Sequence, residues 1–319
     1  MKFYPLTFVP ILKDRIWGGT KLKTYLNKDI VSQTTGESWE ISTVPGDISV
    51  VRSGALSGKN INELIAMYPE QILGTSVISR FGKQFPLLFK FIDAKEDLSI
   101  QLHPNDALAK ERHNSFGKTE MWYVMQADEA ARLVVGFKND SNSAEYLDHL
   151  QRKKVVDLLE MHPVQKGDVF FLETGTIHAI GAGVVVAEIQ QTSDITYRIY
   201  DWDRVDAQGN ERELHTDLAL EAINYATTPS KISYTEVPNS AATVVDCAYF
   251  RTGIIALQDH LQWKKTKDAF TVFMCTNGQF ELVYNGEIMH FQMGDTLLIP
   301  AVIDHLTLKG KATLLEISI

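Results

Sequence analysis

Cysteine is scarce in this chain, since Cys247 and Cys275 are the two cysteines among 319 residues. Such a small number excludes a disulfide framework, and the two residues lie too far apart in the sequence to form a C-x-x-C metal motif. We therefore expect two free thiols in a reducing compartment.

Long hydrophobic runs are also missing. Residues 1–17 contain only short apolar runs, interrupted by Pro5, Pro10 and charged residues, so they lack the continuous apolar region of a signal peptide. No later segment reaches the ~20 apolar residues that are needed to span a bilayer. We expect a cytoplasmic protein without a membrane partner.

An excess of positive charge is the third absence. The chain has 31 Lys and Arg residues against 40 Asp and Glu residues, which gives a formal net charge of −9. This balance argues against nucleic acid or an anionic membrane as the main partner. It does not exclude a phosphorylated small substrate, because a local cluster of Lys and Arg outweighs the global field.

Short β-strands separated by Gly and Pro turns dominate the rest of the pattern. We expect strands over 87–92, 98–103, 118–124, 167–172, 184–189 and 194–200. The dipeptides Asn277-Gly278 and Asn285-Gly286 predict hairpin turns. The segment 294–300 also repeats the pattern of 167–173, which suggests two copies of one β architecture. The sequence therefore predicts a mainly β protein built on a double-sheet jelly roll, not a parallel α/β sheet.

Three segments have helical periodicity, 61–68, 143–161 and 212–225, and the first begins with a capping box formed by Asn60 and Glu63. The polar segment 227–239 contains two prolines and is a candidate linker. With 45% hydrophobic and 22% charged residues, the chain has the composition and length of two soluble domains. We expect a domain over residues 1–228, with inserted helices, and a smaller β-sandwich over residues 229–319.

Polar side chains alternate with apolar ones in the stretch Leu98 to Pro104. A period of two places Ser99, Gln101 and His103 on one face of a strand. In the next strand, Lys118 and Glu120 likewise share a face with Trp122. Two neighbouring strands therefore bring an amide, an imidazole, a carboxylate and an ammonium group toward one place.

A zinc site needs about four ligands drawn from nitrogen, oxygen and sulfur donors, and without cysteine pairs it must use His and carboxylates here. His103 lies beside Gln101 on its strand face, His178 follows a glycine turn at a strand end, and Glu120 supplies a carboxylate. Seven other histidines lack partner spacing and are set aside as surface or core residues: His113, His149, His162, His215, His260, His290 and His305.

The patterns Gln101-x-His103, Glu120 and Gly167-x5-Glu173-x-Gly175-x2-His178 resemble the metal motifs of the cupin superfamily, H-x-H…E and G-x5-P-x-G-x2-H. They depart from these motifs at Gln101 and at Glu173. A Gln in the first position, within L-S-I-Q-x-H-P, is what class I mannose-6-phosphate isomerases show, so the chain resembles a short bacterial member of that family. Five further stretches look like family signatures: Ile16–Gly19, Gly36–Glu40, Gly117–Tyr123, Gly175–Ala179 and Thr196–Asp201.

This resemblance implies one Zn²⁺ per chain, held by Gln101, His103, Glu120 and His178 in a cupin-type catalytic domain. One carboxylate among four donors leaves the ion with a local charge of +1, so it remains electrophilic. The second domain has no H-x-H…E set and is expected to be a metal-free, cupin-like β-sandwich. The implied reaction interconverts mannose 6-phosphate and fructose 6-phosphate by proton transfer between C1 and C2 through a cis-enediolate.

That reaction needs an acid, a base and positive charge near the enediolate. Lys118 faces the same interior as Glu120, and Asp194 and Arg198 match the family pattern S-D-x3-R. We assign proton transfer to Lys118 and Asp194, without deciding which of them is the base, and charge stabilisation to Arg198. A structural ion pair between Asp194 and Arg198 is the alternative for those two residues.

The sequence gives weaker indications for the rest of the substrate. Ser99 and Lys90 resemble family positions near the phosphate, although a structural role is equally compatible with each. Trp17 is a candidate floor for the sugar, although a large aromatic residue in a β core more commonly has a packing role. A phosphorylated hexose is the expected partner of a monomer or homodimer. An Fe²⁺-dependent cupin oxygenase is an alternative, but in that class a His would occupy the position of Gln101. A non-catalytic cupin that binds or senses sugars is a further alternative. In such a protein Lys118, Asp194 or Arg198 would be replaced, whereas this chain has all three.

Overall fold

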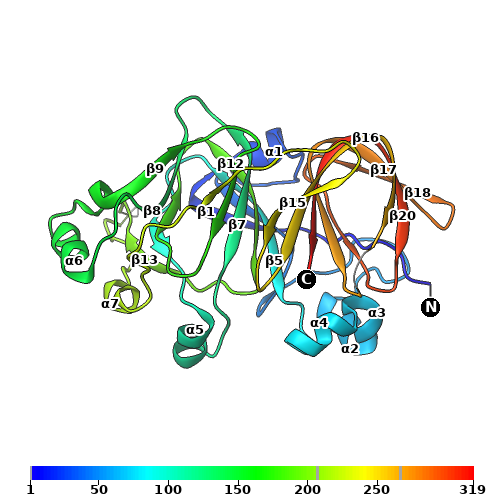
Figure 1. Ribbon diagram of the computed structural model, residues 1–319, viewed down its shortest axis with the longest axis horizontal. Helices are drawn as coiled ribbons and strands as arrows, with labels where there is room; N and C mark the ends of the chain where they lie inside the picture. Colours follow the sequence, from blue (N-terminus) through cyan, green and yellow to red (C-terminus); the bar gives the residue numbers. More distant parts are fainter. Residues whose placement is uncertain (1, 206–207, 266–267) are drawn as a thin grey trace.

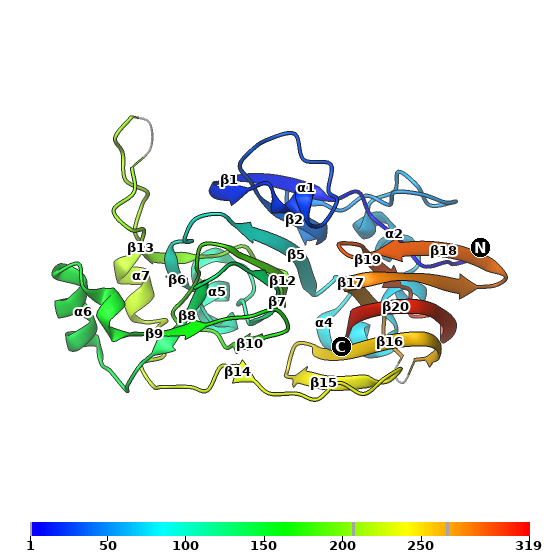
Figure 2. The same cartoon turned by 90° about the horizontal axis from the view of Figure 1, so that it is seen from above.

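The computed structural model describes residues 2–205, 208–265 and 268–319, and it is mainly β (Figure 1). In these residues the strands form three large antiparallel sheets and a small pair, β3 (Thr43–Val44) with β4 (Asp47–Ile48). Figure 2 shows the first two sheets in one half of the molecule and the third sheet in the other half. The predicted mainly β, cupin-type fold is confirmed.

The first sheet has the strand order β1-β2-β5-β12-β7-β10-β14. Its strands are β1 (Ile11–Gly19), β2 (Thr35–Ile41), β5 (Leu87–Ala94), β7 (Glu120–Ala127), β10 (Val169–Leu172), β12 (Val184–Gln191) and β14 (Lys231–Ile232). The last of these lies inside the segment 227–239, which we expected to be a linker. That segment instead adds an edge strand to β10.

The second sheet has the order β13-β6-β11-β8-β9 and faces the first. Its strands are β6 (Ile100–Leu102), β8 (Arg132–Phe137), β9 (Leu159–Pro163), β11 (His178–Ile180) and β13 (Tyr197–Tyr200). Ile92 and Val124 of the first sheet pack with Leu133 and Val135 of the second in one apolar core. The two sheets therefore form a double-sheet jelly roll.

Strand alternation gives the first sheet two different faces. On β5, Phe89 and Phe91 join the core shared with the C-terminal part of the chain, whereas Lys90 and Ile92 point between the two jelly-roll sheets. On β7, Met121 joins that same outer core. The apolar run 87–92 is thus buried on both faces of the sheet, and its charged residue, Lys90, lies on the face toward the second sheet.

The third sheet contains β15 (Ala241–Asp246), β16 (Arg251–Lys264), β17 (Thr271–Tyr284), β18 (Glu287–Gln292), β19 (Thr296–Ile299) and β20 (His305–Ser318). The long strands bend together, because Gly310 of β20 pairs with Asp259 of β16 and with Phe280 of β17, and both Gly310 and Asp259 have positive φ. Residues on both sides of this bend pack into a single core. The sheet therefore curls over its own apolar side chains.

One of the two predicted hairpins is correct. Asn285 and Gly286 both have positive φ and join β17 to β18 as a two-residue turn between Tyr284 and Glu287. The hairpin at Asn277-Gly278 is wrong, because β17 continues through both residues. The register of β17 against β20 shifts between Cys275 and Asn277, so a bulge lies at Thr276, and Asn277 and Gly278 both pair with β20 after it.

The two similar segments of the sequence form the same turn. In the first, Asp168 accepts a hydrogen bond from the backbone N–H of Gln165 at 3.1 Å, and Gly167 has φ of 94°. In the second, Asp295 accepts one from the N–H of Gln292 at 2.8 Å, and Gly294 has φ of 95°. Each turn leads into a short strand, β10 or β19.

The helices are short: α1 (Lys21–Thr24), α2 (Ile61–Met67), α3 (Pro69–Leu73), α4 (Thr75–Phe81), α5 (Asp106–His113), α6 (Ser143–Gln151) and α7 (Thr216–Leu220), with the 3-10 turn η1 (Val155–Leu158). The capping box of Asn60 and Glu63 at the start of α2 is confirmed. The helix predicted over 143–161 ends at Gln151, and β9 begins at Leu159.

The helix predicted over 212–225 is wrong over most of its length, because other parts of the chain bind its flanks. His215 donates its backbone N–H to the carbonyl of Arg198 at 2.7 Å, so the chain before α7 runs beside β13. After α7, the N–H of Asn224 donates to the carbonyl of Gly175 at 2.9 Å. These tertiary hydrogen bonds replace the helical ones that the apolar spacing suggested.

The N-terminal part of the chain also contacts the third sheet. Leu6 forms a bridge with Leu298, Phe270 donates its N–H to the carbonyl of Leu73, and Ala301 donates to Ile72. Helices α2 to α4 therefore lie beside the C-terminal strands (Figure 1). The division into residues 1–228 and 229–319 stays a prediction. No helix in the described residues has the length and apolarity to cross a membrane.

Candidate active site

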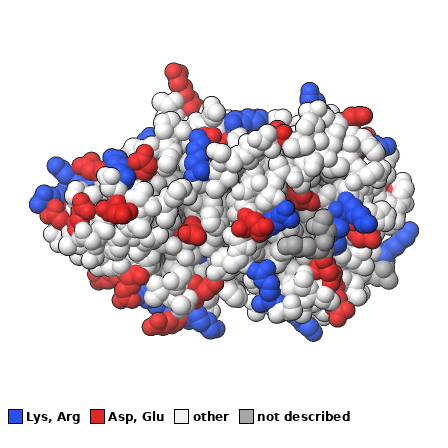
Figure 3. Space-filling view, viewed as in Figure 1, with Lys and Arg blue, Asp and Glu red and all other residues white. Residues whose placement is uncertain are grey.

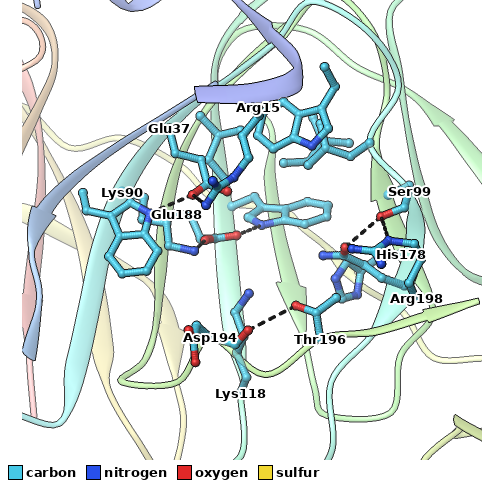
Figure 4. A pocket seen from close by; sticks show the side chains of 18 of the residues that line it. Arg15, Glu37, Lys90, Ser99, Lys118, His178, Glu188, Asp194, Thr196 and Arg198 are labelled. Carbon is cyan, nitrogen blue, oxygen red and sulfur yellow. Dashed lines mark hydrogen bonds and ion pairs between the residues drawn. The ribbon is translucent and has the colours of Figure 1, made fainter. Parts of the chain in front are cut away.

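A cavity of about 380 Å³ opens between the first and second sheets. Eight of the ten residues singled out from the sequence line it: Trp17, Lys90, Ser99, Gln101, Lys118, His178, Asp194 and Arg198. Figure 4 shows labelled side chains converging on it from both sheets. The remaining two, His103 and Glu120, are 2% and 1% exposed and contact its lining residues Lys118 and His178.

His103, Glu120 and His178 form a compact cluster. The Nε2 atom of His103 lies 3.6 Å from Oε2 of Glu120, and Nε2 of His178 lies 3.5 Å from Oε1 of Glu120. One donor atom from each residue falls within 4.8 Å of the others, and all three residues are buried. Ligands about 2 Å from a shared ion have separations of this size.

Backbone carbonyls orient both imidazoles. Nδ1 of His103 lies 2.7 Å from the carbonyl of Ile195, and Nδ1 of His178 lies 2.9 Å from the carbonyl of Thr176. A carbonyl accepts only, so Nδ1 of each ring holds the proton and the lone pair of Nε2 faces Glu120. This is the tautomer that a metal ligand requires.

The charge states and the missing hydrogen bonds fit a cation. Burial and the neighbouring Lys118 ammonium lower the pKa of His178 to about 4 and that of His103 well below its ordinary value. Oε1 of Glu120 and Nε2 of His178 are buried without a hydrogen-bond partner in the described residues. Because unpaired buried donors and acceptors are costly, this set fits a divalent metal ion.

Gln101 adds a fourth donor, its amide oxygen, next to this cluster. It pairs in register with His178 on β11 and with Arg198 on β13, and its side chain faces the cavity. Its Oε1 accepts a hydrogen bond from Oγ of Ser99 at 3.3 Å. The strand alternation predicted from the sequence thus places the amide beside the two histidines.

Lys118 lies between the cluster and the cavity. Its Nζ is 3.0 Å from Oε2 of Glu120 and 3.1 Å from Nε2 of His103, and the side chain is 5% exposed. Burial disfavours the ammonium, but the carboxylates of Glu120, Glu188 and Glu37 outweigh it and raise the pKa of Lys118. The lysine therefore reaches both the proposed ligands and any molecule in the cavity.

Asp194 and Arg198 both line the cavity, but they do not share a strand, because β13 begins at Tyr197. Asp194 is exposed, and among the described residues no ion pair joins it to Arg198. Arg198 donates from Nε to Oγ of Ser99 at 3.4 Å and from a terminal nitrogen to the carbonyl of Glu213 at 2.9 Å. The structural ion pair considered as the alternative is thus absent here.

Sequence reasoning missed two ion pairs on the opposite wall, of which one is buried and one is partly buried. Glu188 of β12 lies 2.9 Å from Nζ of Lys90 and accepts a hydrogen bond from the indole N–H of Trp122 at 3.0 Å. Glu37 pairs with Arg15 at 2.8 Å and accepts the indole N–H of Trp39 at 2.8 Å. A lone carboxylate inside the apolar run 184–189 was the available signal for Glu188.

These pairs hold their carboxylates ionised. Burial raises the pKa of Glu188, but Lys90 and Lys118 outweigh it and bring that pKa to about 2. Burial acts in the same direction on Glu37, and Lys90, Arg15 and Trp39 lower its pKa overall. The wall therefore presents fixed charges and oriented hydrogen-bond acceptors to the cavity.

A second set of charges lies at the mouth, where Arg198 and Arg212 line the cavity. Arg212 donates from Nε to Asp201 at 2.6 Å, and Arg204 pairs with the same carboxylate. Burial and the nearby Arg212 lower the pKa of Arg198, which marks an excess of positive charge there. Three guanidinium groups and one carboxylate favour an anion at this place. The sequence offered no pairing signal for Arg212.

Comparison with known proteins agrees with this geometry. Residues 6–132 match the family model of the phosphomannose isomerase type I catalytic domain, and residues 240–319 match that of the mannose-6-phosphate isomerase cupin domain. The chain is 35% identical to mannose-6-phosphate isomerase ManA of Bacillus subtilis (strain 168), over 97% of this chain and 96% of that one. It is 36% identical to the mannose-6-phosphate isomerase of Streptococcus mutans, over 94% and 93%.

Solved structures show the same relationship. The crystal structure of the mannose 6-phosphate isomerase from Bacillus subtilis superposes with a TM-score of 0.91 at 33% identity, covering 99% of this chain and 100% of that one. A putative mannosephosphate isomerase from Archaeoglobus fulgidus shares the fold, with a TM-score of 0.79 at 21% identity over 99% and 98%.

The fold, the buried donor set and these relatives together identify a cupin-type aldose–ketose isomerase, and membership of this family implies a metal cofactor. More particularly, the chain belongs to the type I mannose-6-phosphate isomerase family. The resemblance inferred from the motifs is therefore confirmed. The individual roles assigned to site residues remain predictions.

Proposed function

We propose that this chain interconverts mannose 6-phosphate and fructose 6-phosphate with one zinc ion, held by Gln101, His103, Glu120 and His178. The observation that best supports this proposal is the pair of buried, unpartnered atoms, Oε1 of Glu120 and Nε2 of His178, beside Lys118. One carboxylate and three neutral donors suit Zn²⁺, which when bound polarises a substrate oxygen.

The chain's own residues then move the proton between C1 and C2 of the sugar through a cis-enediolate. Lys118 and Asp194 face the cavity and are the proposed acid and base, in an order that we leave open. Arg198 lies in register with Gln101 and supplies positive charge where the enediolate oxygen develops. Carboxylates raise the pKa of Lys118, and a bound dication opposes that effect.

The phosphate has two candidate positions. The charge of Lys90 is already neutralised by Glu188 at 2.9 Å. Lys90 is therefore better suited to bind the hydroxyl groups of the sugar than to bind the phosphate dianion. Ser99 lies beside Arg198 at the mouth, where the guanidinium groups of Arg204 and Arg212 share the single carboxylate of Asp201, so the charge of Arg198 is left in excess. We therefore place the phosphate near Ser99 and Arg212, with Trp17 packing against the sugar.

The remaining proposals concern the whole molecule. We propose a cytoplasmic enzyme that is a monomer or a homodimer, with a catalytic domain over 1–228 and a metal-free C-terminal domain over 229–319. In the view of Figure 3 acidic and basic side chains are interspersed over the surface. A surface of mixed charges with a net charge of −9 is compatible with a freely diffusing protein.

The test is a coupled assay for fructose 6-phosphate together with the metal content of the purified protein. We expect one zinc per chain, loss of turnover with a chelator, and recovery when zinc is added back. Gln101→Ala and Glu120→Ala should lose both metal and turnover, whereas Arg198→Ala should keep the metal and lose turnover. Full turnover in metal-free protein would refute the zinc proposal, and full turnover in Arg198→Ala would remove the enediolate role alone.

A further inference from the structure

Two backbone amides on either side of Lys118 are held by side chains from elsewhere in the fold. The N–H of Gly117 donates to Oδ1 of Asp106 at 2.8 Å, and the N–H of Thr119 donates to Oε1 of Gln191 at 2.9 Å. Nε2 of Gln191 in turn donates to Oδ1 of Asp106 at 3.0 Å. The segment that carries the proposed proton-transfer group is therefore fixed at both of its flanking residues.

The anchor of this arrangement comes from the C-terminal part of the chain. The hydroxyl of Tyr249, in the loop between β15 and β16, donates to Oδ2 of Asp106 at 2.6 Å. Tyr249 is half-buried, and burial, with the bond to Asp106, raises the pKa of Tyr249 to about 12. The hydroxyl thus remains a donor throughout the neutral range.

The local packing leaves little freedom for another arrangement. A side chain at Gly117 would place Cβ 2.7 Å from the backbone nitrogen of Asp106, so the chain approaches α5 as closely as it can. Gln191 also donates its backbone N–H to the carbonyl of Thr119 at 3.1 Å. Lys118 itself is buried, with Nζ 3.1 Å from His103, so a small shift of its backbone would move Nζ away from the reacting atoms.

We propose that Asp106, Gln191 and Tyr249 are positioning residues that set the place of the Lys118 amino group, and that Tyr249 is the contribution of the C-terminal part to catalysis. Among the described residues, none of these three lines the cavity or forms a side-chain hydrogen bond with a proposed metal donor. Misplacing a reacting group by about 1 Å costs on the order of 100-fold in rate. The kinetic part of this proposal rests on the proposed function of Lys118.

The test compares two hydroxyl deletions in the full-length protein. Tyr249→Phe removes the donor to Asp106, and Tyr234→Phe removes a matched donor, which bonds the carbonyl of Gly167 at 2.7 Å and does not reach Lys118. We expect Tyr249→Phe to lower kcat about 10-fold, a change of ~1.4 kcal/mol in the barrier, because the Lys118 amino group is held less closely in place, with KM and zinc content unchanged. Tyr234→Phe should leave kcat unchanged.

Two further variants keep the result interpretable. Asp106→Ala should lower kcat by on the order of 100-fold, whereas Asp106→Asn, which retains an acceptor for Gly117, should recover most of it. Amide hydrogen exchange at Gly117 and Thr119, followed by NMR, should speed up in Tyr249→Phe and stay at the wild-type rate in Tyr234→Phe.

The proposal is overturned if Tyr249→Phe matches Tyr234→Phe in both kcat and amide exchange, or if its loss of activity lies in KM or in zinc content. If the wild-type protein does not convert mannose 6-phosphate, the proposed function fails. The exchange rates of Gly117 and Thr119 then still decide whether Tyr249 fixes this segment.

Discussion

The buried ion pair between Lys90 and Glu188 gives the most quantitative prediction. Both side chains are at most 6% exposed, and their charged atoms are 2.9 Å apart. Replacing Lys90 by Met leaves the Glu188 carboxylate buried with the Trp122 indole and the more distant Lys118 as its partners. We expect Lys90→Met to be strongly destabilised at neutral pH.

Two lines of reasoning give the same magnitude. The neighbouring cations hold the pKa of Glu188 at about 2 against an ordinary 4.5, and this difference corresponds to ~3 kcal/mol. Removing one partner of a buried pair costs about 3–5 kcal/mol. Because the pKa is depressed, this stabilisation is complete above pH 4.5 and disappears as the pH falls toward 2. We therefore expect the variant and the wild type to converge at acidic pH.

Urea unfolding at pH 7, followed by intrinsic fluorescence, measures the free energy of unfolding. The double variant Lys90→Met/Glu188→Gln should recover most of the loss, because no unpaired charge remains. Arg152→Met is the control, since its pair with Asp148 has side chains 67% and 46% exposed and is worth less than about 1 kcal/mol. A Lys90→Met protein as stable as the control, or a double variant less stable than the single one, would refute the reasoning.

Three other predictions address the site. Burial raises the pKa of Glu120 to about 7, so zinc rebinding to chelator-treated protein should weaken as the pH falls below 7, measured by titration at pH 6 and pH 8. Arg212→Ala should raise KM for mannose 6-phosphate about 10-fold with a smaller change in kcat, and steady-state kinetics that show an unchanged KM would contradict the phosphate position. Gly117→Ala should lower the free energy of unfolding by about 1–3 kcal/mol, because its Cβ meets the backbone of Asp106 at 2.7 Å; urea unfolding equal to the wild type would contradict this.

The residues of the candidate metal site could be predicted to lie together because their signal is local. Period-two alternation alone places Gln101 and His103 on one strand face, and the glycine turn before His178 is visible in the sequence. The structure adds the register that brings His178 opposite Gln101. Residues that are grouped by the alternation of a single strand, or by a turn next to it, can be identified from the sequence.

The charged wall could not be predicted, because it depends on pairing between distant strands. Glu188 meets Lys90 and Trp122 only in the register of β12 with β5 and β7. Nothing in the stretch around Glu188 specifies those partners. The failed helix over 212–225 has the same origin, since backbone hydrogen bonds to the carbonyls of Arg198 and Gly175 override a periodic pattern.

The contacts between the first eighty residues and the third sheet have a consequence for synthesis in the cell. Leu73 is separated from its partner Phe270 by about 200 residues, and Leu6 from Leu298 by still more. At ribosomal rates of about 5–20 residues per second, the strands that cover the apolar faces of α2 to α4 are synthesised on the order of 10–40 s after these helices. During that interval these apolar faces lack their C-terminal partners, and exposed apolar surface of this kind makes folding intermediates prone to aggregate.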